Sequence, residues 1–237
     1  MFDVTLRPLK DDLFNPLARA VPNSITPLHI TYSAFAFGLA SVGFSTVGYS
    51  KLAVLFWALN RALDCLDGAV ARHRNQQSDV GGFLDLLFDF TVYSLIPICA
   101  AVGSCRDSQG DRGCRNLSST LLAVALLEAA CWLNNFVLFY AAAVAEKVRA
   151  DGAGGTWNGE EKNVREDTKK AELTSVVMRP ALVEGTESAV FFTLMLVCPN
   201  WVGLLSSVMT VGVIWGTGQR VLWLQHALRE EQKDRST

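Results

Sequence analysis

Long apolar stretches, separated by shorter polar ones, dominate the chain. A helix needs about 20 apolar residues to cross the roughly 30 Å hydrocarbon core of a bilayer. The pattern therefore predicts an all-α, polytopic membrane protein with six transmembrane helices, since a soluble all-α protein would have to bury six such stretches. The stretches are Ile30–Tyr49, Leu52–Ala71, Phe83–Val102, Leu121–Val144, Leu182–Cys198 and Val202–Leu222.

The other segments divide the chain around this membrane domain. We expect a juxtamembrane segment over residues 1–22, the membrane domain over 23–225 and a cytoplasmic tail over 226–237. Leu9–Val21 mixes apolar and charged positions, which suits either a short amphipathic helix on the membrane surface or a flexible tail. Residues 146–178 combine glycines with many charges of both signs, which predicts a flexible cytoplasmic loop.

The composition supports this interpretation and gives the protein an orientation. Half of the 237 residues are apolar, 19% are charged, and the formal net charge is -2, which excludes a disordered chain, a collagen and a polybasic nucleic-acid binder. If the N-terminus is cytoplasmic, 17 of the 21 basic residues fall on the cytoplasmic side. By the positive-inside rule, both termini are then cytoplasmic. The four basic residues on the other side are Lys51, Arg106, Arg112 and Arg115.

Two of the six cysteines, Cys105 and Cys114, flank a polar loop that this orientation places on the non-cytoplasmic side. An oxidising compartment would permit a disulfide between them, whereas a metal site there lacks a nearby histidine or further cysteine. The sequence leaves open whether this disulfide forms. It also leaves open which membrane holds the protein, with the endoplasmic reticulum and a bacterial-type inner membrane as the two candidates.

Four acids gather at the cytoplasmic ends of the second and third apolar stretches. Asp64 and Asp67 lie three residues apart, and Asp85 and Asp89 lie four residues apart, so each pair shares one helix face. The short connection over residues 73–82 folds the two helix ends together. Four carboxylates in one low-dielectric volume require protons or cations. Oxygen-only ligands favour Mg²⁺ or Mn²⁺ over zinc, and four acids can hold two such ions.

Residues beside these acids suit a phosphate-bearing ligand. Gly68 and Ala71 are small enough for a ligand to approach the backbone, Arg72 is a permanent cation, and Gly81 lies on the next helix without a side chain. A purely structural interpretation is also open. In it, the first two acids pair with Arg61 and Arg72, and the last two face the cytosol.

Together these residues resemble a known signature. The pattern Asp64-x2-Asp67-Gly68-x2-Ala71-Arg72-x8-Gly81-x3-Asp85-x3-Asp89 is complete in this chain and matches that of the CDP-alcohol phosphatidyltransferase family. Pro22–Thr26 (PNSIT) is similar to the family's Pro-Asn-x-(Ile/Leu)-Thr entry segment. Six spans with both termini in the cytoplasm also resemble the family. The similarity is clearest over residues 20–100 and looser over 118–222.

The resemblance implies an enzyme of phospholipid synthesis. Such an enzyme transfers a phosphatidyl or other substituted phosphoryl group from a CDP-linked donor, here expected to be CDP-diacylglycerol, to an acceptor hydroxyl, and releases CMP. The family is typically dimeric, its donor lipid enters from the bilayer, and its active site faces the cytoplasm. The resemblance further implies that the four aspartates hold two divalent ions and that Asp89 is also the general base. The implied CDP pocket consists of Gly68, Ala71, Arg72, Gly81, Asn23 and Thr26.

The acceptor is left open among inositol, glycerol 3-phosphate, serine, an amino alcohol and another polyol. Arg179 and Glu184, where the fifth apolar stretch begins, and Arg220, where the sixth ends, are candidates for the acceptor pocket. The alternative for these residues is helix capping and salt bridging.

Three polar residues lie inside the fourth apolar stretch. Asn134 and Asn135 either hydrogen-bond to a neighbouring helix or reach toward the acceptor. Glu128 lies about 27 Å from Glu146 at 1.5 Å per residue, which is too far to join the aspartates, and is interpreted as an interfacial or interhelical acid.

Two other functions compete with the enzyme interpretation. A cation-handling transporter would use the acids as an ion site, although they gather at one membrane face rather than along a path. An inactive relative would act as a scaffold, although every residue of the signature is present.

Overall fold

A computed structural model describes residues 13–107, 117–150 and 185–234, and within these ranges every regular element is a helix. This confirms the predicted all-α class. Residues 13–20 form a short helix, which agrees with the helical alternative for Leu9–Val21. The elements that follow are α2 (Pro27–Thr46), α3 (Ser50–His73), α4 (Asp79–Asp107), α6 (Leu117–Ala150), α7 (Gly185–Val197), the 3₁₀ turn η2 (Pro199–Trp201) and α8 (Val202–Asp234).

Four helices in the described part of the chain are long and apolar enough to cross a membrane. α3 falls outside this group because its second half carries the charged residues of the signature, and α7 is described over only 13 residues. The expected helices are thus observed in the expected order, while six membrane spans remain a prediction. The four candidate spans are Pro27–Thr46, Asp79–Cys105, Leu117–Val144 and Pro199–Arg229.

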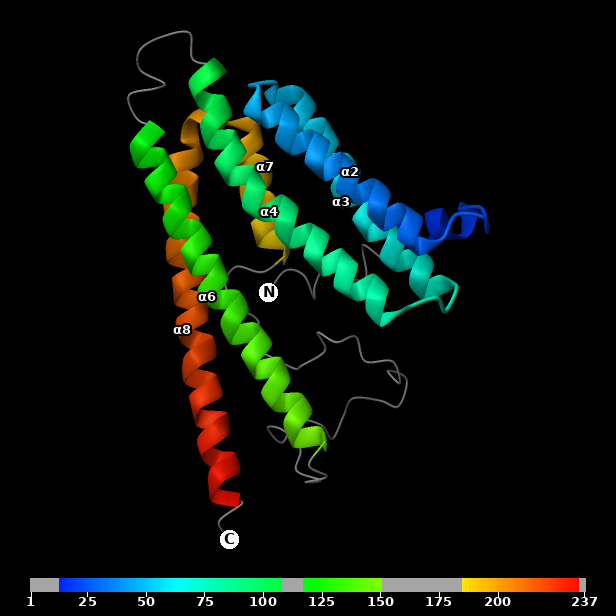
Figure 1. Cartoon of the computed structure of the whole chain (residues 1–237), viewed down its shortest axis with the longest axis vertical. Helices are drawn as coiled ribbons and strands as arrows, with labels where there is room; N and C mark the ends of the chain where they lie inside the picture. The colour runs from blue at the N-terminus through cyan, green and yellow to red at the C-terminus, as the bar shows by residue number, and fades with distance from the viewer. Residues whose placement is uncertain (1–12, 108–116, 151–184, 235–237) are drawn as a thin grey trace.

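The helices form two pairs joined by a central helix, and the partners run antiparallel in the first pair and parallel in the second. α2 and α3 lie side by side, α6 and α8 lie side by side, and α4 crosses between the pairs with α7 behind it (Figure 1). The tight turn from α2 to α3 depends on Gly48, whose φ of 87° is rarely adopted by other residues. Trp57, Ile96, Leu127 and Met195, from four different helices, are buried together in the core.

The close approach of α2 to α4 depends on glycine. A Cβ placed on Gly103 of α4 would lie 1.9 Å from the backbone oxygen of Ser45, near the end of α2. Small residues of this kind let membrane helices pack backbone to backbone. This crossing fixes how far α4 reaches along α2, and with it the position of the acids at the other end of α4.

α6 and α8 continue farthest beyond the apolar stretches that predicted them. α6 runs to Ala150, inside the segment predicted as a loop, and α8 runs to Asp234, inside the predicted tail. Both extensions are rich in Ala, Glu, Lys and Arg, which favour helix without needing a membrane. Hydrophobicity therefore located these helices but ended both of them too early.

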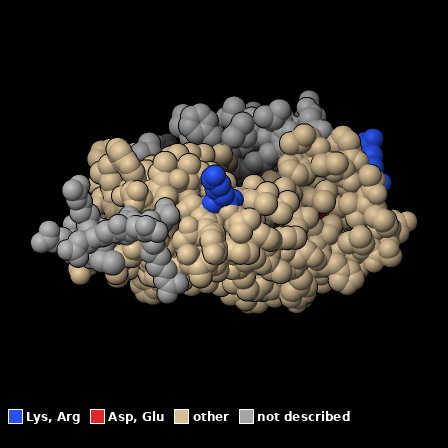
Figure 2. Space-filling view, turned by 90° about the horizontal axis from the view of Figure 1, so that it is seen from above, with Lys and Arg blue, Asp and Glu red and all other residues tan. Residues whose placement is uncertain are grey.

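The end of the molecule that carries the turn from α2 to α3 has few charged side chains on its described surface (Figure 2). The orientation rule assigns only four basic residues to this side of the membrane, and the view agrees with that sparse charge. The carboxylate-bearing ends of α3 and α4 lie at the opposite end of these helices (Figure 1).

Candidate functional site

The four aspartates of the signature meet where the second half of α3 packs beside the first turns of α4. Asp64 and Asp67 come from α3, and Asp85 and Asp89 come from α4. The carboxyl groups of Asp64 and Asp85 hydrogen-bond to each other, and each of the four acids also interacts electrostatically with others of the set. The structure therefore brings the predicted acids into one cluster, here called the aspartate cluster.

A buried hydroxyl on α2 orients one member of the cluster. Thr31 Oγ1 donates a 2.6 Å hydrogen bond to Oδ2 of Asp67, and the two residues are only 7% and 6% exposed. A hydrogen bond to a charged group is stronger than one between neutral groups and fixes its geometry. This contact was not predictable from the sequence, because Thr31 is one polar residue within an apolar stretch, 36 positions from Asp67.

We expect Thr31→Val to destabilise the protein, because it leaves the buried carboxyl of Asp67 without this donor while preserving the shape of the side chain. The expected loss is about 1–3 kcal/mol in the free energy of unfolding. Thermal unfolding in detergent would measure it, with Thr31→Ser, which keeps the hydroxyl, as the matched control. Equal stability of the two variants would show that the hydrogen bond does not hold Asp67.

Arg61 stands between the cluster and two aromatic rings. Its guanidinium carbon lies 4.9 Å from the ring centroid of Trp57 and 5.0 Å from that of Tyr93. Nη1 donates to Oδ2 of Asp89 at 3.1 Å and to Oδ2 of Asp64 at 3.4 Å, and Nη2 donates to Oδ1 of Asp89. Such a two-armed contact is the strongest arrangement available to a guanidinium and a carboxylate.

These contacts test the purely structural interpretation of the four aspartates, in which they form ion pairs or face the cytosol. The pair of Arg61 with Asp64 is present, as that interpretation predicted. In the same interpretation Asp89 faces the cytosol, whereas in the structure Asp89 faces Arg61. Sequence spacing alone missed this pair, since 28 positions and a helix connection separate its members.

The chemistry of the cluster suits a hard divalent cation, because every acidic ligand is a carboxylate oxygen and the acids come from two facing helices. The four carboxylates are nevertheless not arranged as a complete set of metal ligands. Among the described residues, no group of three or more His, Cys, Asp or Glu side chains is placed so that it could hold a metal ion. The side chain found between Asp64 and Asp89 is instead Arg61.

The residues expected to shape a CDP pocket continue along the same two helices. Gly68 and Ala71 are half-buried and Arg72 is exposed. A Cβ on Gly68 would lie 3.2 Å from Nη1 of Arg72, so the guanidinium folds back over the glycine. On α4, the Gly81 N–H donates to Ser78 Oγ at 3.1 Å. Gly68, Arg72 and the aspartates thus share one end of the helix pair, while nucleotide binding remains a prediction.

The entry segment is tied to the end of α3 by Arg74, which lies outside the predicted site. Arg74 donates to the backbone oxygens of Val21, Pro22 and Ile25 at 2.6 to 3.2 Å. This contact places Asn23, which is exposed, beside the end of α3.

Thr26, the other residue expected on the nucleotide side, is the N-cap of α2. Its Oγ1 accepts a 3.4 Å hydrogen bond from the His29 N–H, and its own N–H donates to His29 Nδ1 at 3.3 Å. Such a reciprocal cap stabilises the first turn of a helix. Thr26 therefore has a structural role, and contact with a nucleotide remains a prediction.

The acceptor-pocket candidates are only partly described. Arg179 and Glu184 lie outside the described residues, as does Cys114, so the possible disulfide with Cys105 stays open. Arg220 is buried between α6 and α8, where its Nη1 donates to Oδ1 of Asn134 at 2.7 Å. Thr217 also donates to this oxygen, at 3.3 Å, which confirms the interhelical interpretation of Asn134.

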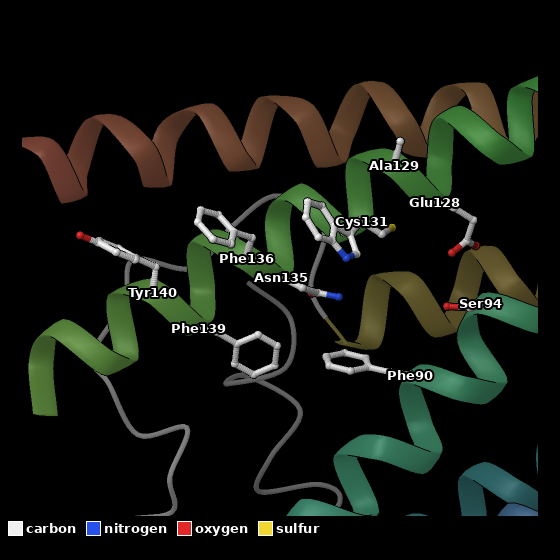
Figure 3. Close-up of a pocket in the computed structure, with 10 residues that line it drawn as sticks. Phe90, Ser94, Glu128, Ala129, Cys131, Asn135, Phe136, Phe139 and Tyr140 are labelled. Atoms are coloured by element: carbon white, nitrogen blue, oxygen red, sulfur yellow. The ribbon is translucent and has the colours of Figure 1, made fainter.

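A groove of about 860 Å³ opens between α4 and α6 (Figure 3). Glu128 lies at one end of it and hydrogen-bonds with Ser94 of α4, which confirms its interpretation as an interhelical acid. Asn135 also lines the groove. The remaining lining residues are Phe90, Ala129, Cys131, Trp132, Phe136, Phe139 and Tyr140.

Comparison with known proteins agrees with the fold and the cluster. The chain is 40% identical over 98 residues to the inner membrane protein YnjF of Escherichia coli (strain K12). That match covers 41% of this chain and 47% of the relative, so the chain matches just under half of the relative's length. The apolar helices and this relative identify an integral membrane protein. The profile of the CDP-alcohol phosphatidyltransferase family matches residues 19–215, and the chain belongs to that family.

Proposed function

We propose that this protein is an enzyme of phospholipid synthesis that transfers a phosphatidyl group from CDP-diacylglycerol to a small acceptor hydroxyl and releases CMP. The observation that carries the proposal is the aspartate cluster, in which all four acids of the family signature meet at one end of α3 and α4. A transporter would need polar groups along a path through the bilayer, whereas these acids gather at one end.

In this reaction Asp89 removes the proton from the acceptor hydroxyl. The acceptor oxygen then bonds to the phosphorus that carries the diacylglycerol, the bond from this phosphorus to the oxygen of CMP breaks, and CMP leaves with the electron pair. A base within hydrogen-bond reach typically contributes about 10²–10⁴-fold to such a step. The proton resides on a carboxylate oxygen of Asp89 until it is passed to solvent.

Asp64, Asp67, Asp85 and Asp89 would hold two divalent ions, Mg²⁺ or Mn²⁺. Bound there, the ions would neutralise charge on the diphosphate and on the departing CMP. The protein's own contribution is to hold the acids in place before substrate arrives. Thr31 performs this task for Asp67 through its buried hydrogen bond.

The CDP group would lie over Gly68 and Ala71, where the helix presents no bulky side chain. Arg72 would turn from Gly68 toward the diphosphate, which its planar guanidinium can bind with two parallel hydrogen bonds. Gly81, Asn23 and the capped turn at Thr26 would complete the nucleotide side of the pocket. We further propose a homodimer, with the active site at the cytoplasmic face of a bacterial-type inner membrane, since the relative is an inner membrane protein.

The decisive experiment supplies purified protein in detergent with CDP-diacylglycerol and Mn²⁺, and measures CMP release. The acceptor panel contains inositol, glycerol 3-phosphate, serine and an amino alcohol. We expect CMP above the acceptor-free background with one member of the panel, and loss of that signal when EDTA removes the cation. An inactive relative would release no CMP with any acceptor, and that result would reject the proposal.

A further inference from the structure

The guanidinium of Arg61 stands among the acids of the candidate active site, although the family signature begins three residues later. Its side chain is 19% exposed, and the side chains of Asp64 and Asp89 that it contacts are 23% and 25% exposed. A positive charge held this close offsets the mutual repulsion of the carboxylates. Arg61 therefore supplies a compensating charge that the cluster needs when it has no bound cation.

Arg61 also occupies the oxygens that the proposed reaction requires. One arm of the guanidinium donates to Oδ2 of Asp89, and the other donates to Oδ1. A carboxylate bound through both oxygens has less freedom to ligate an ion or to accept a proton. Arg61 therefore competes with the divalent ion and with the acceptor proton for the same two oxygens of Asp89.

Arg61 has partners that would keep it in place if it released Asp89. Nε donates to Oδ1 of Asn60 at 2.8 Å, and Nη1 donates to the Tyr93 hydroxyl at 2.7 Å. The rings of Trp57 and Tyr93 lie within cation–π range of the guanidinium. Asn60 is itself anchored to the backbone oxygen of Ala34 at 2.8 Å. The guanidinium can therefore give up a carboxylate without leaving the site.

We infer that Arg61 is a built-in counter-ion of the aspartate cluster, which holds Asp89 while no cation is bound and competes directly with a divalent cation for its oxygens. The inference rests on the proposed function, since it concerns the same acids. It also explains why the acids lie together without forming a ligand shell among the described residues. Cation binding is then an exchange, in which the ion must displace Arg61 from Asp89.

The test is Mn²⁺ binding to the purified, metal-free protein in detergent, without nucleotide or acceptor. Electron paramagnetic resonance of free Mn²⁺ gives the affinity, and thermal unfolding with and without Mn²⁺ gives an independent readout. We expect Arg61→Gln to bind Mn²⁺ about tenfold more tightly than the wild type, because the competing ligand is removed. The metal-free variant should also unfold at a lower temperature, because the acids lose their counter-ion.

Arg61→Lys separates competition for oxygens from simple charge repulsion. Lysine keeps the positive charge but cannot donate to both oxygens with a rigid fork. Competition predicts that this variant also binds Mn²⁺ more tightly than the wild type, by less than Arg61→Gln. Wild-type affinity in Arg61→Lys would leave only a charge effect and would overturn the inference. Arg61→Lys also keeps the test decisive if Arg61→Gln does not fold.

Lys51→Gln is the matched control, since it removes one positive charge from an exposed position at the other end of α3. It should bind Mn²⁺ as the wild type does. Weaker Mn²⁺ binding by both Arg61 variants would show that Arg61 supports the ligands, and would overturn the inference while leaving the proposed function intact. If the wild type itself binds no Mn²⁺, the metal chemistry of the proposed function fails, and the inference fails with it.

Discussion

Asp89→Asn should lower the rate of CMP release by about 10³-fold, the largest effect expected of any single substitution in this chain. The change is nearly isosteric, but an amide cannot take a proton from the acceptor hydroxyl and is a poor ligand for a hard cation. It also weakens the contact with Arg61, which now reaches both oxygens of Asp89. One substitution thus removes the proposed base, a cation ligand and a partner of Arg61.

The measurement is initial CMP release with the acceptor that the panel identifies, at saturating CDP-diacylglycerol and Mn²⁺. Asp79→Asn is the matched control, because it makes the same chemical change at an exposed position in the first turn of α4. We expect this control to stay within about twofold of the wild type, because exposed substitutions away from a site usually have small effects. Asp89→Asn activity equal to that of Asp79→Asn would contradict the role of Asp89 in the reaction.

The acids of the site were predictable because their geometry is local. Spacings of three and four residues place the two acids of each helix on one face. The short connection between α3 and α4 brings the acid-bearing ends of the two helices together. Asp64 and Asp85 do meet, with a hydrogen bond between their carboxyl groups. Spacing within each helix and a short connection between the helices are thus enough to predict that these acids, from two different helices, lie close together.

The partners of these acids were not predictable by the same means. Thr31, Arg61 and Tyr93 reach the cluster through the rotation of α2, α3 and α4 about their own axes. That rotation is set by side-chain packing, and an apolar stretch in a membrane has little periodicity to reveal it. The contact of Asn134 with Arg220 spans 86 positions and was out of reach for the same reason.

One helix that is not among the candidate spans carries half of the aspartate cluster. α3 holds Arg61, Asp64 and Asp67 in its second half, and these charges remove it from the helices that qualify on apolar length. Functional sites are where local sequence rules are expected to fail, since the charges are retained for chemistry rather than for stability. The packing of α3 against α2 and α7 provides the burial that its own composition does not.

Gly103→Ala should be among the most destabilising single-methyl changes in the described chain. The new Cβ would lie 1.9 Å from the oxygen of Ser45 and 3.0 Å from its carbonyl carbon, far inside contact distance. Backbone atoms in a helix end cannot rotate away as a side chain can, so α2 and α4 must separate. Overpacking of this kind costs about 1–3 kcal/mol and sometimes more, which exceeds the gain of up to about 1 kcal/mol from replacing a helical glycine.

Thermal unfolding in detergent, followed by tryptophan fluorescence, would measure the effect. Gly43→Ala is the matched control, because Gly43 lies in α2, the helix that Gly103 contacts, and a Cβ there meets no atom within 4 Å. We expect Gly103→Ala to unfold several degrees below Gly43→Ala, at about 2–4 °C for each kcal/mol in a chain of this size. Since the crossing sets how far α4 reaches along α2, folded Gly103→Ala should also release CMP more slowly, through a displaced Asp89. Equal unfolding temperatures for the two variants would mean that α2 and α4 do not touch at this crossing.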